Sequence, residues 1–230
     1  MNQEKKYKSR PFCKGRIKGI VFDFDGTLLD STREGLNRFI QIATNLGLEV
    51  NDEMIATIKN MWGVPGHILI AECWPHMSSE MFMHEWETFD SVHPIALFPG
   101  VENVLADIAQ RVSLSLLTAR SWSTHAQLRL HGIHEHFCFV CTLDDSPMSK
   151  PHPESIKPVL EHYHESGIGL NNLVFVGDSV RADYALARAL GIDFIALTWG
   201  SSSRSDFLAA GLDNSCIIDT LEDLPPILFA

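Results

Sequence analysis

The stretch IVFDFDGTLLDS, residues 20–31, places two aspartates at the end of an apolar run. Its first residues predict a strand that is buried on both faces, but Asp23 and Asp25 interrupt the apolar pattern. A buried carboxylate without a partner is costly, because a low-dielectric interior disfavours its charge. The stretch therefore predicts that another group compensates these charges where the strand leaves the sheet.

The composition describes an acidic globular chain with an uneven charge distribution. The 230 residues are 45% hydrophobic, which is enough for one sizeable core or for a core domain with a smaller insertion. The formal net charge is −11, yet residues 1–18 contain seven of the 18 lysines and arginines. We expect residues 1–16 to form a basic tail. The acidic remainder argues against a nucleic-acid-binding face and implies that a cation helps to recruit any anionic substrate.

The sequence predicts a cytoplasmic protein without a membrane partner. No apolar run is long enough to span a bilayer, and the N-terminus has no apolar stretch typical of a signal peptide. The five cysteines, an odd number, fit reduced thiols. Cys138 and Cys141 are three positions apart on a predicted strand, so they should point to opposite faces and share no metal.

The order of the predicted elements indicates the fold. Residues 32–93 have helical composition and no strand pattern, so we expect a small all-helical insertion. From residue 94 onward helices alternate with four short apolar runs, at 112–118, 136–142, 172–178 and 193–199. This alternation is typical of a doubly wound parallel α/β sheet of the Rossmann-like kind. The predicted division is a tail (1–16), an α/β core (17–31 and 94–230) and a helical domain (32–93).

Polar residues close several of the predicted strands. Asp23 and Asp25 follow the first strand, Thr118 follows the second, and Asp178 follows the strand at 172–178. Lys150 lies in the loop after the strand at 136–142. Because ligands of open parallel sheets bind beyond the carboxyl ends of the strands, we expect these side chains to meet in one crevice.

Together these residue types indicate phosphoryl transfer. Clustered carboxylates repel one another unless a divalent cation neutralises them, and Mg²⁺ prefers such oxygen ligands. The Thr118 hydroxyl, the backbone N–H groups after it and Lys150 can bind phosphate oxygens. Each feature also has an ordinary explanation: Asp25-Gly26 is a common turn pair, and Asp178 precedes a helix start. The turn explanation leaves Asp23 unexplained, and the joint pattern favours a site.

The same residues resemble the motifs of the haloacid dehalogenase-like hydrolases, in particular the phosphoglycolate phosphatase and beta-phosphoglucomutase type with a helical cap. DFDGT (23–27) resembles the first motif, D-x-D-G-T, and GDSVRAD (177–183) resembles the fourth, with aspartates five positions apart. Thr118 and Lys150 resemble the second and third motifs, which are weak signals without the other two. The resemblance covers residues 17–230, and it implies that residues 32–93 are the cap.

The resemblance implies a nucleophile, an acid–base residue and a metal site. Asp23 would form an aspartyl phosphate, while Asp25 would protonate the leaving oxygen and then activate water. Mg²⁺ would be held by the carboxylates of Asp23 and Asp178 and by the backbone carbonyl of Asp25, with Asp183 in or near the coordination shell.

The resemblance also implies a phosphate-binding set, with one departure from the family pattern. Thr118, Ala119 and Lys150 would bind the phosphate, and Lys150 would keep Asp23 ionised. Position 119 is often Asn in the family but is Ala119 here, so one side-chain contact is missing.

The cap should supply recognition of the leaving group. Arg33, His67 and Arg120 are candidate substrate contacts, and the methionines and tryptophans of the cap either line an adaptable lid or form the cap's own core. The histidines at 130–136 and 161–165 lack a recognisable metal-ligand spacing, so we expect no second metal site there.

The leading hypothesis is a Mg²⁺-dependent phosphatase that acts on a small phosphorylated metabolite. A phosphomutase of the same fold would share every motif, so it stays an alternative. A dehalogenase is disfavoured, because that chemistry needs neither a general acid at Asp25 nor a metal. A catalytically silent phospho-ligand-binding protein is disfavoured by the presence of Asp23, Asp25, Lys150 and Asp178. The sequence leaves monomer and homodimer open.

Overall fold

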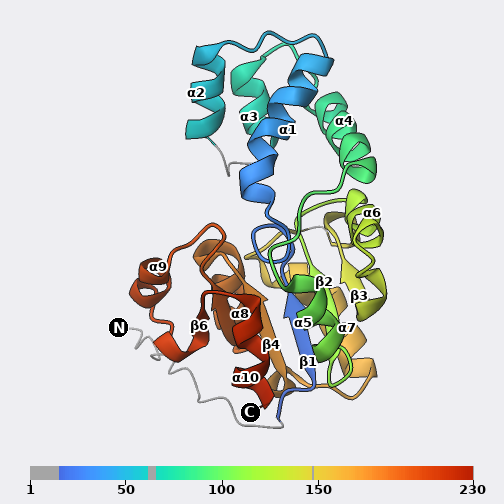
Figure 1. The fold of residues 1–230 in the computed structure, drawn as a ribbon, viewed down its shortest axis with the longest axis vertical. Helices are drawn as coiled ribbons and strands as arrows, with labels where there is room; N and C mark the ends of the chain where they lie inside the picture. The colour runs from blue at the N-terminus through green and yellow to red at the C-terminus, as the bar shows by residue number, and fades with distance from the viewer. Residues whose placement is uncertain (1–15, 62–65, 147, 230) are drawn as a thin grey trace.

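A parallel sheet of six strands organises the part of the chain that the structure describes (Figure 1). The structure is a computed structural model of the chain, and it describes residues 16–61, 66–146 and 148–229. The strands lie in the order β3, β2, β1, β4, β5, β6, and every neighbouring pair is parallel. Their bounds are β1 Gly19–Phe22, β2 Ser113–Leu117, β3 Phe137–Cys141, β4 Leu173–Gly177, β5 Asp193–Leu197 and β6 Ile217–Ile218. The predicted α/β fold with a parallel sheet is confirmed.

The side chains of the strands alternate between two hydrophobic clusters, one on each face of the sheet. In β1, Ile20 and Phe22 belong to one cluster and Val21 belongs to the other, as the two-residue period of a strand requires. Helices α5 (Val101–Ile108) and α10 (Leu224–Phe229) contribute to the first cluster. Helices α7, α8 and α9 contribute to the second, with the bounds Lys157–Glu165, Ala185–Leu190 and Arg204–Ala209. Helices therefore cover both faces, which makes the sheet doubly wound.

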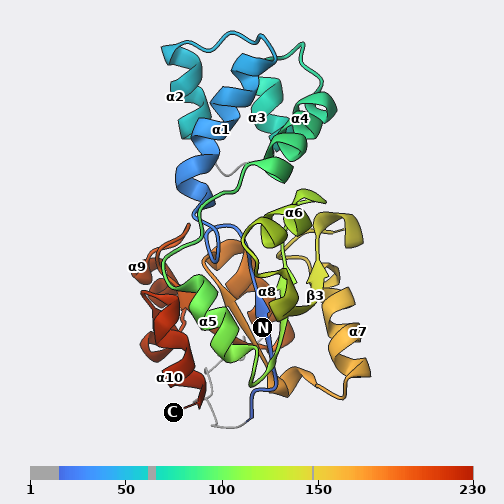
Figure 2. The ribbon, with the colours of Figure 1, turned by 45° about the vertical axis from the view of Figure 1, so that its right-hand side comes forward.

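Four helices form a separate layer beyond the carboxyl ends of the strands (Figures 1 and 2). They are α1 Ser31–Asn45, α2 Asp52–Asn60, α3 Gly66–Cys73 and α4 Ser79–Val92, and we call them the helical module. Their apolar faces meet in a third cluster, in which the rings of Phe39 and Phe82 lie 4.6 Å apart between centroids. The module thus has a hydrophobic core of its own.

Two connections join the helical module to the sheet, and they run side by side. The loop after β1 leads into α1, and the chain returns through residues 93–98. The Asp30 N–H donates to the carbonyl of Ala96 at 2.9 Å, and the Phe98 N–H donates to that of Leu28 at 2.9 Å. These bonds tie both connections together next to the end of β1, where Asp23 lies.

The helix α6 (Ser123–Leu130) lies between β2 and β3 in the chain and packs against α4 of the helical module. It is the part of the α/β core on which the end of α4 rests (Figure 2). The carboxamide of Gln127 accepts from the Ile95 N–H at 2.9 Å and donates to the His93 carbonyl at 2.9 Å. A buried polar side chain of α6 therefore fixes the returning connection.

Several smaller predictions can be compared with the structure. Cys138 is exposed and Cys141 is buried, and the register between β2 and β3 shifts at Leu114 and Ser115, so the opposite faces expected for the two thiols stay a prediction. The predicted tail lies outside the described residues apart from Arg16, which forms an ion pair with Asp193. Within the described ranges, no helix combines the length and apolar character needed to cross a membrane.

Candidate active site

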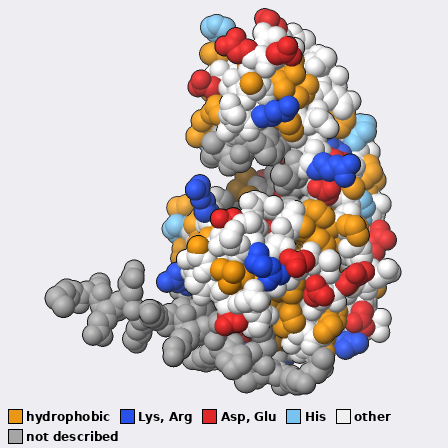
Figure 3. Space-filling model, turned by 60° about the vertical axis from the view of Figure 1, so that its left-hand side comes forward, with side chains coloured by type: hydrophobic (Ala, Val, Ile, Leu, Met, Phe, Trp, Pro, Cys, Tyr) orange, Lys and Arg blue, Asp and Glu red, His pale blue; other side chains and the backbone are white. Residues whose placement is uncertain are grey.

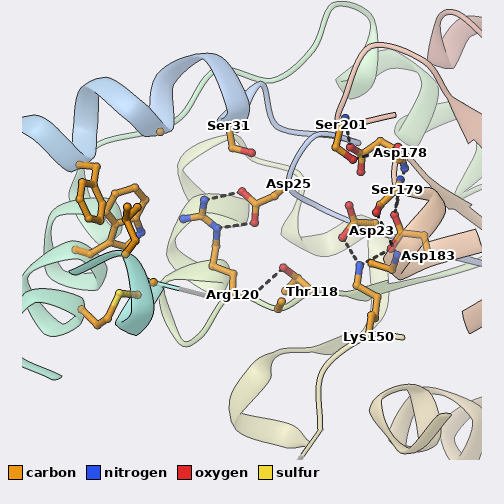
Figure 4. Close-up of a pocket in the computed structure, with 18 of the residues that line it drawn as sticks. Asp23, Asp25, Ser31, Thr118, Arg120, Lys150, Asp178, Ser179, Asp183 and Ser201 are labelled. Atoms are coloured by element: carbon orange, nitrogen blue, oxygen red, sulfur yellow. Dashed lines mark hydrogen bonds and ion pairs between the residues drawn. The ribbon is translucent and has the colours of Figure 1, made fainter. Parts of the chain in front are cut away.

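The ends of three neighbouring strands bring the predicted site residues together. Phe22, the last residue of β1, is in register with Leu116 of β2 and Val176 of β4, so the chain leaves these strands at the same edge of the sheet. Asp23 follows β1 directly, and Thr118 and Asp178 follow β2 and β4. Figure 4 shows these side chains around one cavity.

Lys150 connects two of the acidic side chains. Its ammonium group lies 2.5 Å from Oδ1 of Asp23 and 2.7 Å from Oδ1 of Asp183 (Figure 4). Burial opposes the charge of Lys150, but the two carboxylates outweigh it and raise the pKa of the ammonium group above its usual value. Lys150 therefore stays protonated at the centre of the site.

Three buried carboxylates form a potential metal site. Asp23, Asp178 and Asp183 each offer an oxygen, and these oxygens lie within 4.8 Å of one another. Burial raises the pKa of Asp23 well above its usual value, and the neighbouring carboxylates raise it further, although Lys150 lowers it. Burial and Asp183 likewise raise the pKa of Asp178. The set has more negative charge than Lys150 can balance, so its donors fit a divalent cation that prefers oxygen ligands.

The loop after β1 holds the carboxylates in place. The Thr27 hydroxyl lies within hydrogen-bonding distance of Oδ2 of Asp23, at 3.0 Å, and of Oδ1 of Asp178, at 3.3 Å. Gly26 has a φ of +77°, and a Cβ there would lie 2.6 Å from Oδ2 of Asp178. Glycine is therefore required by both the backbone conformation and the close approach of the carboxylate. The Asp-Gly pair is a turn, and it also makes room for the acidic cluster.

Asp183 is fixed by the start of the segment that follows β4. Its Oδ2 accepts from the backbone N–H groups of Asp178, at 3.2 Å, and Ser179, at 3.0 Å. The Ser201 N–H, from the loop after β5, donates to Oδ2 of Asp178 at 2.5 Å. Asp178 and Asp183 are thus oriented by backbone N–H groups, which lose no side-chain entropy when they are held in place.

Asp25 is held by Arg120 rather than by the acidic cluster. The guanidinium Nε and Nη2 donate to the two oxygens of Asp25 at 3.0 and 2.6 Å (Figure 4). Burial opposes ionisation of Asp25, but the charge and hydrogen bonds of Arg120 outweigh it and lower the pKa of Asp25 below its usual value. In this arrangement Asp25 is a carboxylate.

A chain of alternating charges continues from Arg120 into the helical module. Nη1 of Arg120 also pairs with Asp90 of α4, which is 0% exposed. Oδ1 of Asp90 accepts from Nη1 of Arg38 in α1 at 2.6 Å, and Arg38 also donates to the carbonyls of residues 93 and 94. This row of ion pairs therefore links the site to the first and the last helix of the module. Its order is Asp25, Arg120, Asp90, Arg38.

The cavity has a volume of about 460 Å³ and lies between the sheet and the helical module. Figure 3 shows that the molecule is hollowed between these two parts. The core contributes the charged wall, and the module contributes an apolar wall of Phe39, Leu69, Met83 and Trp86. The site can therefore bind an anionic group at one end and an apolar group at the other.

The structure brings most of the predicted residues to this cavity, but not all of them. Its lining includes Asp23, Asp25, Thr118, Ala119, Arg120, Lys150, Asp178 and Asp183. Two candidate substrate contacts do not line it: Arg33 is 85% exposed, with its guanidinium 3.9 Å from Asp30, and His67 is exposed on α3. Arg33 is exposed to solvent in the first turn of α1, so it adds no charge to the lining of the cavity.

Several residues of the site were not predicted from the sequence. Thr27, Ser201 and Asp90 orient charged groups, and Glu87 of α4 both lines the cavity and accepts from the Ser123 N–H at 3.1 Å. Asp90 carried a detectable signal. It lies four residues after Trp86 and so on the apolar side of its helix, where a carboxylate needs a buried partner.

Comparisons with known proteins agree with this geometry. The family model for haloacid dehalogenase-like hydrolases matches residues 20–197. A phosphoglycolate phosphatase from Yersinia pestis is 29% identical over 225 residues, which cover 92% of this chain and 93% of that protein. Another from Synechococcus elongatus is 27% identical over 211 residues, which cover 90% of this chain and 95% of that protein.

Solved structures of similar shape extend the comparison. A HAD-superfamily hydrolase of subfamily IA from Geobacter sulfurreducens has a TM-score of 0.69 and 26% identity, and the match covers 94% of this chain and 98% of that one. A haloacid dehalogenase-like family protein from Streptococcus pneumoniae shares the fold, with a TM-score of 0.69, 22% identity and coverage of 92% and 98%. The family match spans more than half of the chain and includes the strands that carry Asp23, Thr118 and Asp178. The chain belongs to the haloacid dehalogenase-like hydrolases.

Proposed function

We propose that the protein is a Mg²⁺-dependent phosphatase that hydrolyses a small organic phosphomonoester through an aspartyl phosphate on Asp23. The observation that carries the proposal is the surroundings of Asp23. This buried carboxylate touches Lys150, lies beside Asp178 and Asp183, and faces a cavity that Asp25 also lines. Such a site combines a nucleophile, a fixed cation and a second carboxyl group for proton transfer.

In the first step, an oxygen of Asp23 attacks phosphorus, and the bond between phosphorus and the leaving oxygen breaks. Lys150 and the Thr118 hydroxyl bind the phosphate oxygens, with the backbone N–H of Ala119 as a further donor. Lys150 lowers the pKa of Asp23, although burial and the other carboxylates raise it. Lys150 therefore favours the ionised nucleophile without being sufficient for it.

Asp25 has opposite tasks in the two steps. It gives a proton to the leaving oxygen in the first step, and it takes a proton from the attacking water in the second, which regenerates the Asp23 carboxylate and releases phosphate. The pairing with Arg120 favours the carboxylate form, which suits the second step. In the first step Asp25 must hold a proton. This requires the guanidinium of Arg120 to shift part of its hydrogen bonding from Asp25 to the substrate phosphate.

The metal site is proposed from the donor set. Mg²⁺ would be held by carboxylate oxygens of Asp23 and Asp178 and by the backbone carbonyl of Asp25, with Asp183 close by. Bound there, it would supply positive charge that neutralises the carboxylates and the transferring phosphoryl group. Both oxygens of Asp183 already accept hydrogen bonds, so its main contribution is to hold Lys150 and the segment after β4.

The relatives support a small substrate. The two proteins reported above are named phosphoglycolate phosphatases, and this chain covers more than 90% of the length of each. A cavity of about 460 Å³ is also in the range of sites for small molecules.

The test is a panel of phosphomonoesters incubated with the purified protein, with phosphate release as the readout. We expect turnover with Mg²⁺, loss of turnover in EDTA and recovery with excess Mg²⁺. Asp23→Asn should lower kcat by at least about a thousand-fold, because an amide cannot act as the nucleophile.

Asp30→Asn is the matched control, because Asp30 lies in the same loop but does not line the cavity. It should retain the activity of the parent protein. Activity that survives Asp23→Asn would rule out the aspartyl phosphate, and isomerisation of a sugar phosphate without phosphate release would favour a phosphomutase.

A further inference from the structure

The helical module presents an apolar surface to the leaving-group end of the cavity. Phe39 of α1, Leu69 of α3, and Met83 and Trp86 of α4 line this end. Two of them, Met83 and Trp86, are only partly buried although they pack against the module's own cluster. Both side chains line the cavity, so a ligand that covers their exposed parts would gain from burial of apolar area.

Small residues widen this end of the cavity. Gly35 of α1 and Gly66 of α3 line it together with the apolar side chains. A Cβ at Gly66 would lie 3.1 Å from the sulfur of Met83, so a larger residue there would press on the apolar wall. Gly66 therefore lets α3 pack closely against Met83, and the cavity of about 460 Å³ beside the wall can take a substituent on the substrate.

The basic side chains of the module are not available to this space. Arg38 is buried and already bonded to Asp90 and to two carbonyls, Arg33 is 85% exposed, and Lys59 is exposed on α2. Among the described residues that line the cavity, the basic ones are Lys150 and Arg120, and both belong to the core. Lys150 is shared between two carboxylates, and Arg120 is shared between Asp25 and Asp90.

The charged groups of the lining also disfavour a leaving group with a negative charge. Its described acidic members are Asp23, Asp25, Asp178, Asp183 and Glu87. When Asp25 holds a proton for the first step, Lys150, Arg120 and a divalent cation only balance the other four carboxylates, so no positive charge of the lining is left for a second anion. Glu87 lies on α4 next to Trp86 of the apolar wall, and its negative charge would repel an anionic leaving group.

On the basis of the proposed function, we propose that the helical module selects phosphomonoesters whose leaving group is uncharged and apolar, a short alkyl or aryl alcohol, and disfavours leaving groups that carry a carboxylate. The apolar wall binds the substituent, and Glu87 repels a second anion. The phosphate itself is bound by the core, so the selection acts on the alcohol.

The experiment compares two substrates of nearly the same shape, isobutyl phosphate and 2-phosphoglycolate, in which a branched alkyl group replaces a carboxylate. With the full-length protein and saturating Mg²⁺, we expect kcat/KM to be at least about ten-fold higher for isobutyl phosphate. Equal values, or a preference for 2-phosphoglycolate, would overturn this inference while leaving the phosphatase intact. Failure to hydrolyse any phosphomonoester would instead contradict the proposed function.

A pair of variants tests whether the module is responsible. Met83→Lys places an ammonium group on the apolar wall and should raise the ratio of kcat/KM for 2-phosphoglycolate over isobutyl phosphate by about ten-fold. Met81→Lys adds the same charge to α4 at a position that is 52% exposed and does not line the cavity, so the ratio should stay unchanged. An equal shift in both variants would overturn the assignment to the wall. Circular dichroism checks that both variants fold.

Discussion

The two walls of the cavity are built on different physical principles. In the core wall, charged side chains follow strand ends and are held by backbone donors and ion pairs, as Asp183 is by two N–H groups and by Lys150. In the wall of the helical module, apolar side chains such as Met83 and Trp86 lie at the edge of a hydrophobic cluster. The core wall holds charged groups in fixed directions, as phosphoryl transfer needs, whereas the module wall offers an apolar area of a given shape. The proposed chemistry and the proposed selection therefore fall in separate parts of the chain.

The joint between the two parts follows neither pattern. Where α4 meets α6, the contact is buried and polar: Asp90 pairs with Arg120, and Glu87 accepts from the N–H of Ser123. These bonds run from the module to residues that follow β2, next to the proposed catalytic groups. The position of the module and the state of Arg120 are thus physically connected, and changes at this joint test how separate the two walls are.

The largest effect is expected from Asp90→Ala. This change leaves Arg120 and Arg38 without their shared buried carboxylate, and breaking a buried ion pair by removal of one partner costs about 3–5 kcal/mol. We expect the free energy of unfolding to fall by about this amount, measured by urea denaturation with tryptophan fluorescence and circular dichroism as readouts. The loss should appear as earlier unfolding of the module if the two parts separate.

An exposed ion pair provides the control. Asp107→Ala removes the partner that Arg111 has in the last turn of α5, where the two side chains lie 3.0 Å apart and are 45% (Asp107) and 49% (Arg111) exposed. Its effect should be within about 1 kcal/mol. If Asp90→Ala were as mild as Asp107→Ala, the joint would not depend on its buried charges.

Much of the core wall could be predicted from the sequence, because its residues sit at the ends of apolar runs. A run that is buried on both faces has a clear pattern, and parallel topology brings the carboxyl ends together. Asp23, Thr118 and Asp178 therefore line one cavity, as expected from their positions after β1, β2 and β4. Lys150 was placed from its loop and its resemblance to a family motif.

The joint could not be predicted in the same way. Asp90 and Arg120 are 30 residues apart, and their contact depends on how α4 packs against α6, which no local pattern specifies. For the same reason Arg120 was expected to contact substrate, and its pairing with Asp25 was missed. The last strand, Ile217–Ile218, also escaped prediction, because two residues are too few to show a period.

The second prediction concerns pH. Burial opposes ionisation of Asp25, and the charge of Arg120 reverses this effect, so Arg120→Met should raise the pKa of Asp25. Each part of the pH–rate profile that depends on the ionisation of Asp25 should then move to higher pH. The measurement is kcat and kcat/KM for isobutyl phosphate across the pH range. A raised pKa means that Asp25 stays protonated to a higher pH, which favours the acid step and delays the base step.

Arg111→Met is the matched control for this change. It removes an exposed arginine that follows α5 and does not line the cavity, and it should leave the profile in place. A profile that is unchanged in Arg120→Met would show that the titration of Asp25 is independent of the joint, and the two walls would be more separate than the ion pairs indicate.

The smallest effect is expected from a change in the contact between the loop after β5 and the loop after β1. The indole N–H of Trp199 donates to the carbonyl of Thr27 at 3.2 Å, and the ring stacks on Phe98 with centroids 4.4 Å apart. Trp199→Phe keeps the stacking but removes the donor, so the free energy of unfolding should fall by about 1 kcal/mol in urea denaturation. Trp122→Phe, at a position that is 46% exposed, is the control for the loss of an indole and should have a smaller effect. Because Thr27 contacts Asp23 and Asp178, a large loss of kcat in Trp199→Phe would mean that this single bond, rather than the whole set of backbone donors, sets the geometry of the core wall.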